Sequence, residues 1–268
     1  MTDGDSPEKR PFGEVDLTPE EFEAANIRRR PAPAINAPGV VIVLAGIMFL
    51  IHLGLEFASY DFANRTILTL AFSPARFLSP PELALVWPEL GGRPLPGGEI
   101  ARVTSFFSYA VLHGSWAHLV MNLVWMLAFG SVAARRLGPA RFIGLSMLAA
   151  GVAAAFSLVL TWGTGAILVG ASGAIAGQMA VAVRLIFAHG GTLSSSLRKD
   201  LSQVPPEPLR LLFTNKSAVV FIAVWFGVDM LTASSGVLTD ARIAWEAHLG
   251  GFLTGLLVFG WIDPAKAR

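Results

Sequence analysis

Hydrophobic residues gather in six stretches of the chain, each long enough to cross a lipid bilayer as a helix. A helix that spans the hydrocarbon layer needs about 20 mostly apolar residues. The stretches that meet this requirement cover residues 39–59, 106–134, 140–161, 167–188, 217–236 and 244–262, the second being the least cleanly bounded. The pattern predicts an all-α fold, a polytopic membrane protein built as a bundle of six transmembrane helices.

Polar segments divide this core from the rest of the chain. Residues 1–38 are polar and lack an apolar core, which is typical of a disordered or loosely structured tail. Residues 60–105 form a long connection rich in proline and glycine, and connections of that length are usually functional or disordered. The sequence therefore predicts a tail over 1–38, a membrane core over 39–262 and a short carboxy-terminal tail over 263–268.

The composition is typical of a membrane protein and excludes every kind of site that depends on cysteine. Hydrophobic residues make up 53% of the 268 residues and charged residues 15%, whereas about 25% of the residues in soluble domains are charged. The net charge of +1 gives no sign of a nucleic-acid partner. The chain has no cysteine, so disulfides, thiolate metal sites and cysteine nucleophiles are excluded.

Lysine and arginine are distributed asymmetrically between alternate connections. If the amino terminus lies inside, the inner segments hold most of the basic residues, and the outer segments hold only Arg65, Arg76, Arg93, Arg102 and Arg242. Basic residues favour the cytoplasmic connections of membrane proteins. The bias predicts a multi-pass protein with both termini in the cytosol, and the minimal six-span core suits a bacterial inner membrane.

Five polar residues inside the predicted spans are expected at a similar depth. His113, His118 and Asn122 fall in the first half of the second span, Ser172 opens the fourth and His248 opens the sixth. Even-numbered spans all run from outside to inside, so the five residues lie in the outer half of the membrane. Polar groups inside a bilayer cost free energy and usually have a function.

Small residues allow the fourth and sixth spans to approach each other closely. Each span has two glycines four residues apart, a spacing that lets helix backbones meet. The pairs are Gly173 with Gly177 and Gly251 with Gly255. His248 shares a helix face with the second pair, so we expect it to press against Ser172. A serine and a histidine in contact can act as nucleophile and general base. The sequence pattern places no carboxylate as a third member.

The same region offers donors for a developing negative charge. Ser172 is expected near the amino terminus of its helix, where backbone N–H groups lack intrahelical partners. His118 and Asn122 are four residues apart and share one helix face. Their side chains can donate to the same oxygen as the Ser172 N–H, an arrangement typical of oxyanion stabilisation in acyl transfer.

Other interpretations of these residues stay open. A serine among glycines can serve helix packing alone. His113, His118 and His248 are possible zinc ligands, although the chain has no HExxH motif and no carboxylate close to them in these motifs. His52 and Glu56, four residues apart in the first span, can form a proton relay or be interfacial polar residues.

Three motifs closely resemble the rhomboid family of intramembrane serine proteases. The family pattern H-x4-H-x3-N reads HGSWAHLVMN from His113 to Asn122, and G-x-S-G reads GASG from Gly170 to Gly173. The pattern A-H-x-x-G-x-x-x-G reads AHLGGFLTG from Ala247 to Gly255. The motifs occur in order and in spans of matching direction, and the resemblance covers residues 39–262.

The resemblance implies a role for each matching residue. Ser172 is expected to be the nucleophile and His248 the general base. His118 and Asn122 are expected to stabilise the oxyanion together with the Ser172 N–H, and His113 to brace the outer loop. The positions expected to have structural roles near the site are Gly170, Gly173, Gly251, Gly255, Glu99 and Arg102.

The chain departs from the family pattern at two positions. Ala101 stands where the family has a tryptophan in the outer loop. Ala176, four residues after Ser172, stands where the family often has an aromatic residue against the base.

The function that the resemblance implies is that of an endopeptidase that cleaves transmembrane segments of other proteins near their outer end. Its partners are then transmembrane substrates and the lipid bilayer, and it needs no cofactor and no metal; the sequence does not indicate an oligomeric state. One alternative is a rhomboid-like protein that binds membrane clients without cleaving them. Another is a transporter or proton channel that uses His52, Glu56, His113 and Asp229. Asp229, in the outer half of the fifth span, is expected to line a water-filled cavity without a catalytic role.

Overall fold

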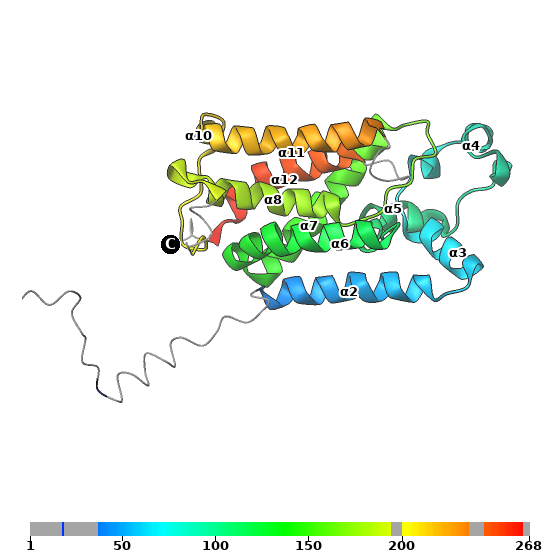
Figure 1. Ribbon diagram of the computed structural model, residues 1–268. Helices are drawn as coiled ribbons and strands as arrows, with labels where there is room; N and C mark the ends of the chain where they lie inside the picture. Colours follow the sequence, from blue (N-terminus) through cyan, green and yellow to red (C-terminus); the bar gives the residue numbers. More distant parts are fainter. Residues whose placement is uncertain (1–17, 19–36, 194–199, 236–243, 265–268) are drawn as a thin grey trace, which may run out of the picture. The chain divides into compact units, whose positions relative to one another are not determined.

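The computed structural model describes Thr18 and residues 37–193, 200–235 and 244–264. In this part of the chain the regular elements are helices, with one isolated backbone bridge and no strand, which confirms the all-α prediction there. The predicted amino-terminal tail falls almost wholly outside the described residues. The α-helices of Figure 1 are α2 (Gly39–Glu56), α3 (Tyr60–Leu70), α4 (Pro80–Val86), α5 (Gly98–Ser108), α6 (Trp116–Trp125), α7 (Ser131–Leu160), α8 (Ser172–Ile186), α10 (Leu209–Leu212), α11 (Lys216–Ser235) and α12 (Trp245–Ile262).

Among the described residues, two helical runs are long and apolar enough to cross a bilayer: α2 and the run from Trp116 to Leu160. The second run joins α6 to α7 through a π-helical turn, Met126–Gly130. It is interrupted at Gly138, whose backbone angles (φ 74°, ψ 167°) are not helical and which precedes Pro139. Gly138 therefore separates two helices where the second and third spans were expected to meet. Helices α8, α11 and α12 occupy the remaining stretches, and the count of six spans stays a prediction.

The second apolar helix begins later than the hydrophobic pattern predicts. The pattern starts a span at residue 106, whereas α6 begins at Trp116. Ser115 caps α6 by accepting a hydrogen bond from the His118 N–H at 3.2 Å. The preceding apolar residues belong instead to α5 and to a short 3₁₀ turn, Tyr109–Val111. A capping serine interrupts a helix even where hydropathy continues across it.

The fourth apolar helix also begins later than predicted. The pattern starts a span at residue 167, whereas α8 begins at Ser172. Leu168 is extended and exchanges two backbone hydrogen bonds with Phe72, at 3.1 and 2.8 Å. Gly170 then has φ +109°, a conformation that other residues rarely adopt. The chain therefore reaches Ser172 through an extended and sharply turned segment.

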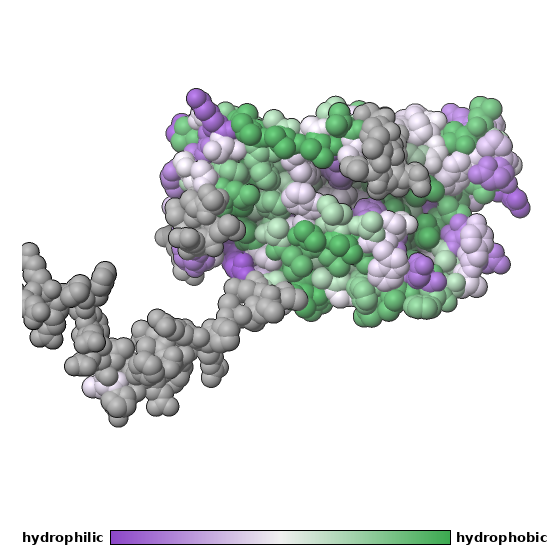
Figure 2. All heavy atoms as spheres, viewed as in Figure 1, coloured by the Kyte–Doolittle hydropathy of each residue, from purple (hydrophilic) through white to green (hydrophobic). Residues whose placement is uncertain are grey.

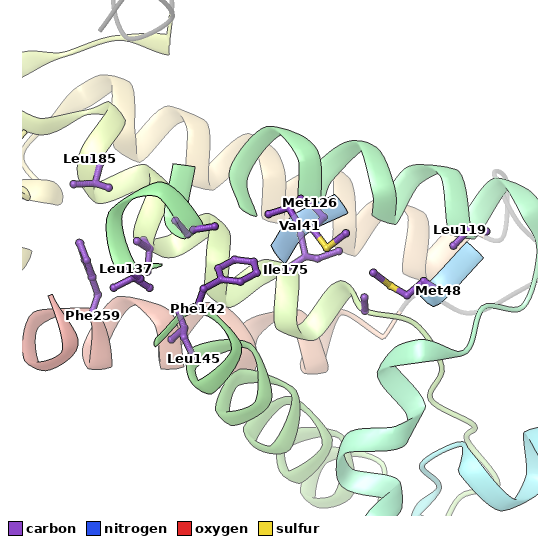
Figure 3. Packing of buried hydrophobic residues seen from close by; sticks show 14 residues of the cluster. Val41, Met48, Leu119, Met126, Leu137, Phe142, Leu145, Ile175, Leu185 and Phe259 are labelled. Carbon is purple, nitrogen blue, oxygen red and sulfur yellow. The ribbon is translucent and has the colours of Figure 1, made fainter. Parts of the chain in front are cut away.

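Helix α8 lies at the centre of the bundle, with α12 and α7 packed along it (Figure 1). Every residue from Gly173 to Ile186 is buried. Ile175 of α8 belongs to one hydrophobic cluster with Phe142 of α7 and Met126 of the π-helical turn (Figure 3). The position of α8 means that its first turn is held by neighbours on several sides.

Helices α8 and α12 meet backbone to backbone. A Cβ atom placed on Gly251 would overlap the carbonyl oxygen of Gly173, and one on Gly255 would overlap the carbonyl oxygen of Gly177. On another side of α8, a Cβ on Gly173 would lie 2.6 Å from the Cβ of Ala153 in α7. The predicted contact between the two glycine pairs is confirmed.

The long connection between the first two spans is folded rather than irregular. It contains α3, α4 and α5 and has its own small core of Ala75, Leu83 and Leu95. Helix α4 starts with proline and is capped by Ser79, whose backbone N–H donates to the Glu82 carboxylate at 2.8 Å. The Phe72–Leu168 bridge ties this segment to the loop that leads into α8.

A buried ion pair lies at the end of the bundle where α12 ends, away from the start of α8. The Arg136 guanidinium of α7 donates to both carboxylate oxygens of Asp263, at 2.7 and 2.9 Å, and also to the Ser202 carbonyl oxygen. Arg184 of α8 donates to the carbonyl oxygens of Glu207 and Leu256, at 3.0 and 3.2 Å. Asp263 thus packs with the helical core, directly after α12.

The surface matches a protein surrounded by lipid. Figure 2 shows hydrophobic residues across the middle of the visible face and hydrophilic residues toward its ends. Large apolar side chains are exposed on several helices, examples being Leu50, Val124, Val159, Val224 and Leu257. Apolar surface of this extent is stable in a bilayer and unusual on a soluble monomer.

Candidate active site

Ser172 is the first residue of α8 and is half-buried. The Ile175 N–H donates to the Ala171 carbonyl oxygen at 2.9 Å, so the Ser172 N–H lies in the first turn, ahead of that bond. Backbone N–H groups at this position have no partner within the helix and carry partial positive charge. The predicted placement of Ser172 at a helix amino terminus is therefore correct.

His118 and Asn122 lie on α6 and face the loop that precedes Ser172. A Cβ on Gly170 would lie 2.7 Å from His118 Nε2 and 3.8 Å from Asn122 Nδ2. The Asn122 Nδ2 group donates to the His118 carbonyl oxygen at 2.9 Å. Both polar side chains therefore approach the backbone two residues before Ser172, as their shared helix face predicts, and the absence of a side chain at Gly170 makes room for them.

His248 lies in the first turns of α12, beside the start of α8. A Cβ on Gly173 would lie 3.7 Å from the carbonyl oxygen of Ala247, the residue before His248. Gly251, one turn later, contacts Gly173 directly. The structure thus brings the turn that carries His248 against the turn that carries Ser172.

Asp229 of α11 holds the other side of the His248 ring. Its Oδ2 atom lies 2.7 Å from His248 Nδ1, and the two side chains are 9% and 12% exposed. The sequence pattern places no carboxylate beside His248, and the structure corrects this point. The predicted topology contained the signal: it expects Asp229 in the outer half of the fifth span and His248 in the outer half of the sixth, and antiparallel spans would bring the two residues to one depth.

Trp225 also contacts His248. The two rings are stacked, with centroids 5.9 Å apart and planes 28° apart. Trp225 precedes Asp229 by four residues, so both side chains project from one face of α11. Ala176, the position where the resemblance expects an aromatic residue, is buried in α8. The aromatic ring beside His248 therefore comes from α11.

The remaining predicted residues lie farther from Ser172. His113 precedes α6 instead of lying within it; it is buried, and its ring meets the His118 ring edge-on at 5.2 Å. Glu99 and Arg102 form an exposed ion pair on α5 at 2.9 Å, and the Arg102 guanidinium lies over the Phe77 ring. This pair is part of the folded connection and contacts neither Ser172 nor His248.

His52 and Glu56, the two residues considered for a proton relay, lie in different environments. His52 is buried with its ring edge-on to Trp116, at 4.6 Å, whereas Glu56 is exposed. In the part of the chain that the structure describes, no group of three or more histidine, aspartate or glutamate side chains is arranged to hold a metal ion.

An open apolar cavity of about 530 Å³ has Trp225 in its lining. Trp125 borders it from the α6 side, and Val224, Trp225 and Val228 border it from α11. Trp225 thus lines the cavity and also stacks against the His248 imidazole. A cavity with an apolar lining suits a hydrophobic chain.

A comparison with known protein families places these residues in one domain. The family model described as Rhomboid domain matches residues 101–265, which include α6 to α12 and therefore His118, Asn122, Ser172, Asp229 and His248. No curated protein matches the chain.

Proposed function

The chain belongs to the rhomboid family of integral membrane proteins, and on that basis we propose that it is an intramembrane serine endopeptidase. In this proposal Ser172 is the nucleophile and His248 the general base. The substrates are transmembrane segments of other proteins, which the enzyme cleaves near their outer end.

The observation that carries the proposal is the contact between the first turns of α8 and α12. Gly251 and Gly173 touch through their backbones, and His248 and Ser172 are each within one turn of that contact. Helix packing alone does not require a serine and a histidine at these two places. A nucleophile and a base do require such closeness, because the proton must pass directly between them.

The reaction proceeds by acyl transfer. The Ser172 hydroxyl oxygen attacks the carbonyl carbon of the scissile peptide as its proton moves to the His248 imidazole. The negative charge that develops on the carbonyl oxygen is stabilised by the Ser172 N–H and by donors from His118 and Asn122. The imidazolium then protonates the leaving amine, and water hydrolyses the acyl-enzyme by the same steps.

The apolar cavity beside Trp225 supports a transmembrane substrate. A segment cut near its outer end continues inward through the bilayer, and the cavity between the α6 and α11 sides offers it an apolar wall. The peptide bond must first leave its helix, because in a helix its carbonyl oxygen accepts an i→i−4 hydrogen bond. Substrates with helix-destabilising residues at the cut are therefore favoured.

The proposed setting is a bacterial inner membrane with both termini in the cytosol. The asymmetry of arginine and lysine between alternate connections supports this orientation. The site then opens toward the outer face, where water for the second step is available.

The test is cleavage of a panel of single-span substrates by the purified protein in liposomes. Wild type is expected to cut at least one substrate within the outer third of its apolar segment. Ser172→Ala, equally folded by thermal melting, is expected to cut none. Cleavage that persists in Ser172→Ala would contradict the proposal.

A further inference from the structure

Two residues of α11 contact the His248 imidazole from different directions. Asp229 Oδ2 meets the ring edge at Nδ1, 2.7 Å away. Trp225, one turn earlier, stacks against the ring face. A contact at the edge and a contact on the face together fix both the tilt and the rotation of the ring.

We infer that Asp229 is a positioning residue that sets the tautomer and orientation of His248, an inference that rests on the proposed function. An ionised carboxylate can only accept hydrogen bonds. The proton of the neutral imidazole is therefore held on Nδ1, which donates to Asp229. The lone pair then lies on Nε2, the atom that must accept the Ser172 proton.

The carboxylate also acts while the proton moves. The Ser172 O–H bond breaks, the proton joins Nε2, and the serine oxygen bonds to the carbonyl carbon, whose π electrons move to the oxygen. The imidazolium so formed carries a positive charge beside the Asp229 carboxylate. When the peptide C–N bond breaks, the proton passes from Nε2 to the amine, and the imidazole returns to its starting tautomer.

The burial of Asp229 indicates that its carboxylate does more than interact with solvent. Its side chain is 9% exposed on a helix whose neighbouring positions, Val228 and Met230, are exposed apolar residues. A carboxylate at such a position costs free energy, and ionisable residues in membrane helices usually have a partner and a function. The partner in this structure is the proposed base.

The inference is tested first by kinetics. Asp229→Asn keeps the size of the side chain and removes its charge. We expect kcat to fall by about 10²–10⁴-fold, the usual contribution of general-base catalysis, with KM within threefold of wild type. Asp229→Glu, which restores a carboxylate, is expected to recover at least tenfold in kcat over Asp229→Asn.

The matched control is Asp263→Asn, which removes the charge of a buried carboxylate paired with Arg136 at the opposite end of the bundle. It is expected to lower the melting temperature while the kcat of the folded protein stays within about twofold of wild type. If Asp229→Asn behaves in the same way, Asp229 has a structural role alone and the inference is wrong.

A spectroscopic measurement tests the tautomer without depending on any Asp229 variant. Among the five histidines of the ¹⁵N-histidine-labelled wild-type protein, the signal of His248 is identified by its loss in His248→Gln. We expect this signal to report a protonated Nδ1 and an unprotonated Nε2 at neutral pH. A protonated Nε2 with a bare Nδ1 would overturn the inference.

Failure of the proposed function has a different signature. If wild type shows no cleavage that depends on Ser172, the endopeptidase proposal fails, whatever tautomer the spectrum reports. If cleavage depends on Ser172 but not on Asp229, the endopeptidase proposal stands and the inference about Asp229 fails.

Discussion

Gly251 of α12 and Gly173 of α8 lie so close that position 251 has no space for a methyl group. Ser172 is the neighbour of the one glycine, and His248 precedes the other by one turn. Since two backbones define this distance, the separation of Ser172 and His248 is set by main-chain packing.

Gly251→Ala is expected to separate the two helices. Its new methyl group would overlap the Gly173 carbonyl oxygen, and overpacking of this kind typically costs about 1–3 kcal/mol. The melting temperature in detergent and the cleavage rate should both fall. Gly144→Ala on α7, where a Cβ has no neighbour within 4 Å, should lower neither, because alanine is the better helix former. Equal melting temperatures for the two variants would contradict the close contact.

Ser172→Ala and His248→Ala are each expected to abolish cleavage. The double variant should be no worse than either single variant, because the two residues act as one unit and their losses do not add. The measurement is turnover of a fluorogenic transmembrane substrate. Additive losses would argue that the two residues work independently.

Asn122→Ala is expected to lower kcat by ~10–10³-fold with a smaller effect on KM, because the Ser172 N–H and His118 remain as donors. Asn122→Asp should be worse, since an ionised carboxylate offers no donor and repels the developing oxyanion. Steady-state kinetics, with thermal melts of the same samples, distinguish the two. A folded Asn122→Asp variant with wild-type kcat would remove Asn122 from the oxyanion site.

The proposed topology is tested by labelling engineered cysteines, since the natural chain has none. Cysteines at positions 3 and 266 should react only with reagents applied to the cytosolic side. A cysteine at position 92, in the connection between α4 and α5, should react only from the opposite side. Reaction of 92 and 266 from the same side would mean that the number of spans between them is even.

Hydropathy and spacing predict much of this molecule because both express constraints of the bilayer. The glycine pairs, the shared face of His118 and Asn122, and an interruption between the spans 106–134 and 140–161 all agree with the structure, which places the interruption at Gly138. The starts of α6 and α8 do not follow hydropathy, since a serine cap and an extended bridge fix them through backbone hydrogen bonds. The short helices before α6 are missed because their proline-rich sequence lacks an apolar stretch of spanning length.

Asp229 and Trp225 illustrate a different limit. Their contacts with His248 join two helices across 19 and 23 residues of chain, and periodicity within a single helix carries no information about them. The depth argument that united Ser172 with His248 applies equally to Asp229. Comparing the predicted depths of all polar groups in the membrane would therefore have identified His248 as the partner of Asp229.

Helix α11 meets α12 in a way that contrasts with the meeting of α8 and α12. Trp225, Phe226 and Asp229 reach α12 through side chains, onto His248 and Phe252. Different parts of a protein open at different free energies. We expect the side-chain contacts of α11 to break at a lower temperature than the backbone contact between the glycines of α8 and α12. On gradual heating, the orientation of the imidazole is therefore lost before its position. Cleavage of a substrate by the protein should stop several degrees below the temperature at which the helices separate. The cleavage activity should return on cooling.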